Sequence, residues 1–465
     1  MNNFNLKNFK LNNVPIPPKS VWKLIGPSFI LIGLGLGSGE LILWPSLVAN
    51  YGLGIIWGAV LGITFQYFLN MEIERYTLAN GESIFVGFAR LSKILPYWFI
   101  ISTILAWSWP AFAVSSANTL GYFNIENLNK IAIFQIIFVA LVIILGPSLY
   151  KTIEWFQKIL VLIGLPIILF IFISIIDFNA LLQLVKGIIG IGEGYFLIPK
   201  NSNFPWYEFL GAIAFSGAGG NLLLAQSFYV KDKGYGMGAY SKSIKSLITG
   251  SDTEDYEIDI TGSKYRHTLE NNYRMRQWWK LANIEHLSVF WGLGLLTMLM
   301  LAMISYVSNY GNNSHFTGLS FINNQANIIS YSIGDTMGNI FIIVIFLFLF
   351  STQLAVTDGA ARIITENIAI LYNHKKGYFI QKFYYSTVLA LSIFAISIIL
   401  IGFDQPLKLV TTTAVLNMIC MVVFSGLLNK LNHRFSTFKA SSYRRLVINI
   451  SFIFFIILTI YTIFF

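Results

Sequence analysis

Cysteine is almost absent from this chain of 465 residues, since only Cys420 occurs, inside an apolar run. A single cysteine excludes a disulfide framework, and a thiolate metal cluster would need several chains. Charge is also scarce, because 11% of the residues are charged, against roughly 25% in soluble domains. So little charge cannot cover a water-facing surface, and an aromatic content of 16% excludes a solvated, disordered coil.

Apolar residues dominate the chain instead, at 55% of the composition with a mean hydropathy of +0.66. Eleven runs approach the ~20 residues needed to cross a bilayer. They lie near residues 25–50, 53–79, 95–120, 131–149, 158–177, 207–230, 284–306, 337–358, 383–402, 408–429 and 446–464. Backbone groups in lipid must be satisfied within their own segment, so these runs are expected to be helices. The sequence therefore predicts an all-α membrane protein with 11 transmembrane helices.

Basic residues are distributed unevenly among the connecting segments. With a cytoplasmic N-terminus, all but four of the 31 Lys and Arg residues fall on the cytoplasmic side, and the exceptions are Lys130, Lys186, Lys200 and Lys408. This asymmetry sets the orientation of membrane proteins. It predicts a multi-pass plasma-membrane protein with a cytoplasmic tail (1–24), a solvated cytoplasmic loop (231–280) and an external C-terminus. The net charge of +10 then needs no nucleic-acid partner, and the sequence indicates no obligate protein partner.

Two of the apolar runs are unusually rich in glycine. The first, GPSFILIGLGLGSGELILWPSLVANYG, has glycine at alternate positions, namely Gly33, Gly35, Gly37 and Gly39. The sixth, WYEFLGAIAFSGAGGNLLLAQSFYV, has Gly217, Gly219 and Gly220 shortly before Asn221. Glycine inside a helix costs about 1 kcal/mol relative to alanine. We therefore expect both helices to be interrupted, near residues 36–40 and 216–221.

The two interrupted helices lie five helices apart, and five is odd, so a repeat of that length places its halves in opposite orientations. The predicted fold is a LeuT-like 5+5 inverted repeat, with broken helices 1 and 6. Repeat 1 covers residues 25–177, repeat 2 covers 207–429, and helix 11 (446–465) is an appendage. Transporters of this plan bind substrate at the breaks near the membrane midplane. Carbonyls freed at a break attract a cation, and the amides of the following half-helix attract an anion.

Several stretches share a pattern with one transporter family. They are Gly26-Pro27 through Tyr51-Gly52, FQYFLNMEIERYTLANGES, the glycine-rich sixth helix, ANIEHLSVFWGLGLL and FSTQLAVTDGAARIITENI. Together they resemble the Nramp family of proton-coupled divalent metal transporters in the APC superfamily, over about residues 21–430. The resemblance implies a secondary active transporter and symport of a divalent cation, with no enzymatic activity and no cofactor. An intramembrane enzyme would need a Ser/His or His/Glu combination at membrane depth, and the sequence pattern shows none.

Departures from the family pattern fall at the predicted site. The Nramp family has Asp-Pro-Gly-Asn at the first break, and the corresponding residues here are Gly37, Ser38, Gly39 and Glu40. Its Met-Pro-His-Asn in helix 6 corresponds to Ala218, Gly219, Gly220 and Asn221. The acids associated with proton transfer in helix 3 of that family have no counterpart. Loss of the methionine removes the soft ligand that favours transition metals, so we expect a hard divalent ion such as Mg²⁺.

The predicted substrate site gathers residues of both breaks and one residue of helix 10. It comprises Gly37, Ser38, Gly39, Glu40, Phe215, Ser216, Gly217, Ala218, Gly219, Gly220, Asn221 and Asn417. Glu40 and Asn221 are the predicted metal ligands. Glu40 is the only acid near the centre of helix 1, where a charge costs at least ~2.5 kcal/mol. Asn417 occupies the helix 10 position where the resemblance places a glutamine near the metal.

Other interpretations of these residues stay open at this point. Ser38 and Asn221 also suit helix caps, and Glu40 suits the first turn of a half-helix. The turn at residues 37–39 resembles the Gly-Ser-Gly turn of amino-acid transporters, so the alternative function is transport of a small carboxylate or amino acid through an anion site. Glu40 argues against that alternative, because an ionised carboxylate repels an anion. The five histidines fall in polar stretches or at segment ends, so no buried histidine-ligated metal is expected.

Overall fold

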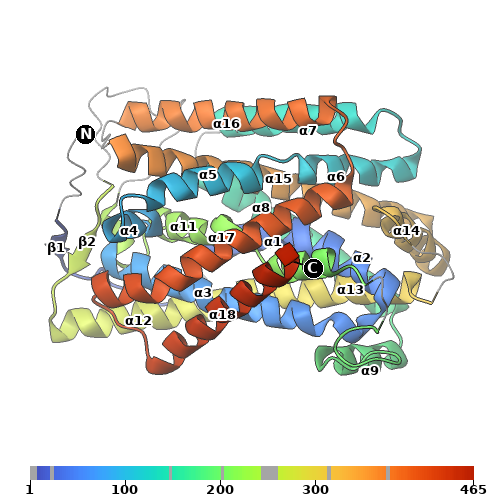
Figure 1. Cartoon of the computed structure of the whole chain (residues 1–465), viewed down its shortest axis with the longest axis horizontal. Helices are drawn as coiled ribbons and strands as arrows, with labels where there is room; N and C mark the ends of the chain where they lie inside the picture. Colours follow the sequence, from blue (N-terminus) through green and yellow to red (C-terminus); the bar gives the residue numbers. More distant parts are fainter. Residues whose placement is uncertain are drawn as a thin grey trace.

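The computed structural model describes residues 8–20, 26–145, 149–200, 204–241, 260–311, 316–372 and 377–464. Most of these residues are helical, and a two-stranded parallel sheet joins β1 (Lys10–Asn12) to β2 (Ser263–Tyr265). In Figure 1 the long helices run mostly along the long axis of the molecule, while α17 and α18 cross obliquely. The sheet lies at one end of the molecule, and the short helices α9 and α14 lie at the other end.

The first half of the chain contains the first five predicted spans and three short helices outside them. Its elements are α1 (Pro27–Gly35), η2 (Leu36–Leu43), α2 (Trp44–Tyr51), η3 (Leu53–Ile55), α3 (Trp57–Asn80), α4 (Ile84–Leu91), α5 (Leu95–Trp107), α6 (Ala111–Thr119), η4 (Leu120–Phe123), α7 (Leu128–Leu145), α8 (Leu149–Ile175) and α9 (Phe178–Ile188). α9 begins at Asp177, whose side chain accepts a hydrogen bond from Ala180 N at 2.8 Å. This N-cap starts a short helix between the fifth and sixth predicted spans.

The second half contains the remaining six spans. Its helices are α10 (Trp206–Ala214), η5 (Gly220–Ala225), α11 (Gln226–Asp232), η6 (Gly236–Tyr240), α12 (Leu269–His286), η7 (Leu287–Leu293), α13 (Gly294–Asn309), α14 (Ser320–Ile333), α15 (Asp335–Tyr372), α16 (Gly377–Leu400), α17 (Pro406–Phe435) and α18 (Ser442–Phe464). Within the described residues, 10 helices are long and apolar enough to cross a membrane. The predicted run 207–230 is not among them, because it is divided between α10, η5 and α11.

Helix 1, as we call Pro27–Tyr51, differs from its prediction. The predicted interruption at 36–40 is wrong, because the chain continues as a π-helix from Leu36 to Leu43 between α1 and α2. A π-helix keeps the backbone hydrogen bonds, now between residues five apart. Unwinding would strand those groups in an apolar interior, where each unsatisfied group costs several kcal/mol. The glycines of this helix instead allow close approach of its neighbours.

The cytoplasmic loop predicted at 231–280 is shorter and more ordered than expected. α12 begins at Leu269, so the span that starts there runs for 41 residues to Asn309. Upstream of it, β2 pairs with β1 in the register Lys10↔Ser263 and Asn12↔Tyr265. The N-terminal tail is therefore attached to this loop. Residues 242–259, which include the acidic stretch, lie outside the described part of the chain.

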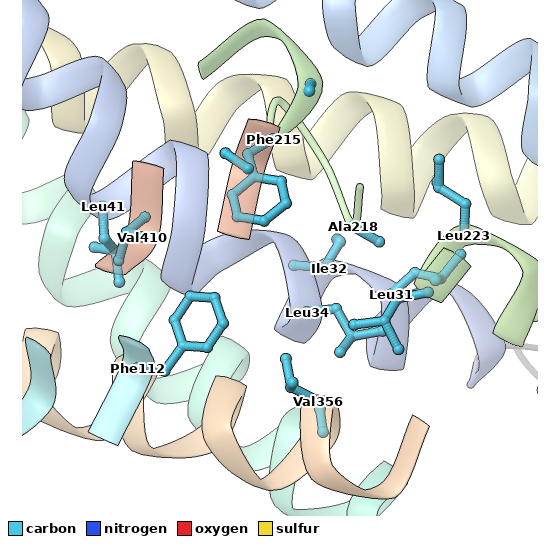
Figure 2. Close-up of a cluster of buried hydrophobic side chains, with 14 of the residues drawn as sticks. Leu31, Ile32, Leu34, Leu41, Phe112, Phe215, Ala218, Leu223, Val356 and Val410 are labelled. Carbon is cyan, nitrogen blue, oxygen red and sulfur yellow. The ribbon is translucent and has the colours of Figure 1, made fainter. Parts of the chain in front are cut away.

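We call the segment Trp206–Asp232 helix 6. The interior is packed around helix 1 and the non-helical part of helix 6. The 18-residue apolar window of helix 1 is 100% buried. Figure 2 shows apolar side chains gathered there from α1, η2, α6, helix 6, α15 and α17, among them Leu31, Leu41, Phe112, Phe215, Val356 and Val410. Polar groups that face this region are consequently removed from water.

Candidate functional site

Helix 6 is interrupted where the sequence predicts it. α10 ends at Ala214, and a helical conformation resumes only at Gly220. Gly219 (φ +68°) and Gly220 (φ +49°) have positive φ values, a region in which glycine carries no steric penalty. Residues 215–219, which we call the break, therefore place non-helical backbone in the core, where its polar groups need partners.

Gln66 on α3 supplies partners on both sides of the break. Its Nε2 donates to Ala214 O at 2.9 Å, and its Oε1 accepts from Gly219 N at 3.3 Å. The side chain is fully buried. Gln66 is not among the predicted site residues, although an amide in the middle of the second apolar run is a usable signal, because polar groups at that depth normally have a role.

Replacing Gln66 by leucine is expected to destabilise the break. The substitution keeps the approximate volume but leaves a buried carbonyl and a buried amide unpaired, at a cost of about 1–3 kcal/mol. The expected result is a lower melting temperature of the purified protein. Gln405→Leu is the control, because Gln405 is exposed and its side chain makes no capping hydrogen bond. Equal melting temperatures for the two variants would show that Gln66 does not hold the break.

The π-helical segment η2 touches the break directly. A Cβ atom built on Gly39 would lie 1.9 Å from Phe215 O, and one on Gly35 would lie 3.2 Å from the carbonyl carbon of Gly217. Trp44 is the first residue after η2, and its Nε1 donates to Ser216 Oγ at 3.0 Å. The structure therefore brings predicted site residues of helix 1 and helix 6 together, although helix 1 is not interrupted.

Gly37 belongs to a different contact. A Cβ atom on it would lie 2.2 Å from Thr352 Oγ1 on α15. That hydroxyl is within 2.8 Å of Gly33 O and 3.0 Å of Phe348 O, and both carbonyls can accept from it. Gly37 thus allows helix 1 to pack against α15 instead of facing the break. The side chain of Ser38 lies outside the described part of the structure.

Glu40 is buried with incomplete hydrogen bonding. The residue is 1% exposed, and its Oε2 atom has no hydrogen-bond partner. Its Oε1 atom lies 3.3 Å from a Cβ built on Gly35 and 3.6 Å from one built on Gly294, so the carboxyl group sits between the end of α1 and the start of α13. Burying a carboxyl group without partners is costly, which makes it a ready acceptor for a proton or a cation.

The two asparagines each present one unpaired oxygen atom. Asn221 Nδ2 donates to Ser102 Oγ (2.8 Å) and Thr103 Oγ1 (2.9 Å) on α5, and its Oδ1 has no partner. Asn221 therefore joins helix 6 to α5 and is not the helix cap that was considered. Asn417 Nδ2 donates to Thr413 O at 2.9 Å, and its unpaired Oδ1 lies 1.7 Å from a Cβ built on Gly220. Gly220 thus leaves room for a side-chain oxygen at the end of the break.

Two other predicted residues contribute no ligand atom from their side chains. Phe215 stacks on Trp107, with ring centroids 5.6 Å apart and an interplanar angle of 14°. Ala218 is fully buried and carries only a methyl group. Any ligand that they provide must be a backbone carbonyl.

A second buried polar cluster, which the sequence did not predict, holds the start of helix 1. Glu285 on α12 accepts from Gly26 N and Ser28 N at 3.4 Å each, and from Ser28 Oγ at 2.5 Å. This carboxyl group caps the first turn of α1 from another helix, where a negative charge also complements the helix dipole. His286, which the sequence places at the end of a polar stretch, is fully buried, with Nδ1 2.8 Å from Ser28 Oγ and Nε2 unpaired.

Ion pairs connect helix 6 to its neighbours at the same end of the molecule. Arg362 on α15 pairs with Asp232 at 2.8 Å and with Asp358 at 2.9 Å, and Lys233 pairs with Glu154 at 2.6 Å. Arg362 and Asp358 are buried. Among the described residues, no group of three or more His, Cys, Asp or Glu side chains is arranged to hold a metal ion. A cation at the candidate site would therefore rely on few carboxylates and several neutral oxygens.

No protein-family model matches the sequence, and no curated protein matches it either. Solved structures of a manganese transporter from Eremococcus coleocola do match. One variant of that transporter gives a TM-score of 0.69 at 12% identity, covering 98% of this chain and 89% of the other. A second variant gives 0.66 at 13% identity, with coverages of 98% and 88%. The complex with an aromatic bis-isothiourea substituted compound gives 0.60 at 13% identity, with coverages of 98% and 90%.

This chain has the fold of those transporters. The predicted LeuT-like, mostly helical fold is confirmed, except that helix 1 is not broken. At the level of the fold, the resemblance to the Nramp family is confirmed as well. The predicted number of 11 spans stays a prediction, because 10 helices of the described residues qualify. The chain is a multi-pass membrane protein whose spans follow the predicted order. Identity of 12–13% carries no residue roles across, so the role of each site residue rests on its own contacts in this chain.

Proposed function

We propose that this chain is a secondary active transporter, not an enzyme, that carries a small, hard divalent cation across a plasma membrane. The observation that carries the proposal is Glu40, a buried carboxyl group with an unpaired oxygen beside the contact between helix 1 and helix 6. The fold supports the proposal, because its relatives of known structure are described as manganese transporters.

The proposed ligands are oxygen atoms throughout. Glu40 supplies the charge, the break supplies backbone carbonyls, and Asn221 and Asn417 each have an unpaired Oδ1. Helix 1 contributes no carbonyl of its own, because η2 keeps its backbone hydrogen-bonded. Oxygen ligands with one carboxylate suit a hard ion that retains water, such as Mg²⁺.

The alternative function, transport of a small carboxylate or amino acid, has lost its main support. It required bare amides at residues 37–39 to receive an anion. In the π-helix these amides belong to a continuous helix and are not the exposed start of a half-helix. The buried Glu40 carboxyl group also stands next to Gly39 in the chain. We therefore propose only the cation.

The proposed orientation places the N-terminus in the cytoplasm and the C-terminus outside. The tail and β2 carry basic residues, including Lys10 and Lys264, as expected of a cytoplasmic surface.

The selectivity of the purified protein tests the proposed substrate. Because no soft ligand is available, we expect Mn²⁺ to bind no more than about tenfold more tightly than Mg²⁺, a difference of at most ~1.4 kcal/mol. Titration calorimetry of each ion, followed by uptake into proteoliposomes, measures both affinity and transport. A preference for Mn²⁺ above about a hundredfold would contradict the hard site. Uptake of a carboxylate or an amino acid without any divalent cation would contradict the proposed function itself.

A further inference from the structure

A cavity of about 210 Å³ opens at the turn between α17 and α18, away from the candidate substrate site. It is lined by Asn429, Asn432, His433, Lys439, Ala440 and Arg445. α17 and α18 both qualify as membrane spans, the first ending at Phe435 and the second starting at Ser442. The turn that joins two spans lies at the membrane surface, so the cavity lies at the depth of lipid headgroups.

The lining of this cavity is basic and contains no acidic residue. Residues 430–445 include five Lys or Arg residues and no Asp or Glu. Asn429, Asn432 and His433 are three and four residues apart on α17, so they share one helix face. Lys439 comes from the turn and Arg445 from α18. The Nδ2 atoms of Asn429 and Asn432 already donate within the protein, so the charged donors of this concave site are Lys439 and Arg445.

The positive charge of this site is not neutralised by the protein. Among the described ion pairs, eight other Lys or Arg residues have an acidic partner, whereas Lys439 and Arg445 have none. Lys439 Nζ donates to His433 O at 2.5 Å, and Arg445 Nη2 donates to Ser442 Oγ at 3.2 Å. Both partners are neutral oxygens, which orient the two cations without cancelling their charge.

The nearest acidic side chain behind the cavity is already committed. Glu72 on α3 accepts a hydrogen bond from Asn432 Nδ2 at 3.4 Å. Its carboxylate also forms ion pairs with Arg75 at 2.7 Å and Arg444 at 3.6 Å. The field at the cavity therefore favours an anion.

An apolar surface continues from the basic site along α18. Leu446 (57% exposed), Ile450 (46%), Ile453 (54%) and Ile457 (58%) follow one another at intervals of four, three and four residues. This spacing places them on one helix face, and the face begins one residue after Arg445. A free phosphate ion would use only the basic end, whereas an anionic phospholipid would use both the basic end and the apolar face.

From this geometry we infer that the cavity between α17 and α18 binds the headgroup of an anionic phospholipid, with an acyl chain along the exposed face of α18. Lys439 and Arg445 contact the phosphate, since charged donors form the strongest hydrogen bonds to it. The general preference for basic residues on the cytoplasmic side accounts for the number of charges but not for their convergence on a cavity without acids. Basic pockets at this depth are typical headgroup sites.

The experiment compares lipids on the purified full-length protein. Delipidated protein in neutral detergent is titrated with phosphatidylglycerol, phosphatidylcholine or inorganic phosphate, and binding is followed by native mass spectrometry and by the shift in melting temperature. The wild-type protein is expected to bind phosphatidylglycerol at least about tenfold more tightly than phosphatidylcholine. Equal binding of the two lipids would overturn the inference. Displacement of phosphatidylglycerol by millimolar phosphate would also overturn it, in favour of a free-anion site.

Matched variants locate the site. The double variant Lys439→Gln/Arg445→Gln is expected to lose the preference for phosphatidylglycerol. The double variant Lys430→Gln/Arg434→Gln removes the same charge from exposed positions outside the cavity lining. It is expected to keep the preference for phosphatidylglycerol. An equal loss in both pairs would mean that the basic segment attracts anionic lipid without a site. The lipid comparison on wild-type protein needs no variant to fold, and neither arm measures transport, so the inference and the proposed function can fail separately.

Discussion

Glu40→Gln is expected to abolish cation transport while the protein still folds. Glutamine has the same shape but no charge, so a bound cation loses a charged ligand worth about 1.5–3 kcal/mol. Cation affinity should fall about ten- to a hundredfold, and uptake into proteoliposomes should fall to background. Because Oε2 of Glu40 has no hydrogen-bond partner in the protein, the fold loses little, and removal of a buried charge lowers its desolvation cost.

The control for this prediction is Glu126→Gln. Glu126 is exposed in the connection between η4 and α7, so its substitution removes the same charge without touching the core. It should transport at the wild-type rate. If Glu40→Gln transports as well as this control, the carboxyl group is not a cation ligand, and the cation proposal fails at its central residue.

Gly39→Ala is expected to separate helix 1 from the break in helix 6. The added methyl group would lie 1.9 Å from Phe215 O and 2.6 Å from Phe215 C. Both are backbone atoms, so no side-chain rotation relieves the clash, and one helix must shift. Overpacking of this kind costs about 1–3 kcal/mol. We expect a lower melting temperature together with loss of uptake, because the shift displaces Glu40 from the break.

Gly121→Ala serves as the matched substitution. A Cβ atom at Gly121 would first meet Leu128 Cδ1 at 3.4 Å, an ordinary contact with a flexible side chain. This variant should match the wild type in melting temperature and in uptake. Wild-type behaviour of Gly39→Ala would mean that helix 1 and helix 6 are not in contact at this position, which would remove the structural basis of the candidate site.

Much of the fold could be predicted because it follows from local properties of the chain. Hydropathy over about 20 residues identifies a span without regard to what the span packs against. Within the described residues, each of the eleven predicted runs is mostly helical, although the run 207–230 contains the break. The interruption of helix 6 was also local, since Gly219 and Gly220 adopt positive φ values that other residues avoid. Glu40 was recognisable as a costly acid within an apolar run, and its burial is confirmed.

The partners of the site residues could not be predicted, because they come from distant parts of the chain. Gln66 lies 148 residues from the carbonyl it binds, and Glu285 lies 257 residues from Ser28. No periodicity or spacing reveals such pairs. The sequence also suggested that Asn221 caps a half-helix, whereas the side chain bonds to Ser102 and Thr103 on α5.

The sequence by itself determined that this protein spans a membrane, where its helices run and where helix 6 is interrupted. It also determined which acid, Glu40, lies near the centre of helix 1. Each of these depends on composition and local backbone preference, which act before any tertiary contact forms. The tertiary structure decided the conformation of helix 1. Its glycines are as dense as those of helix 6, but Gly37 packs against Thr352 and Gly39 against Phe215. Helix 6 unwinds in the same dry interior where Gln66 bonds to both sides of its break, whereas helix 1 keeps its own backbone hydrogen bonds by widening into a π-helix.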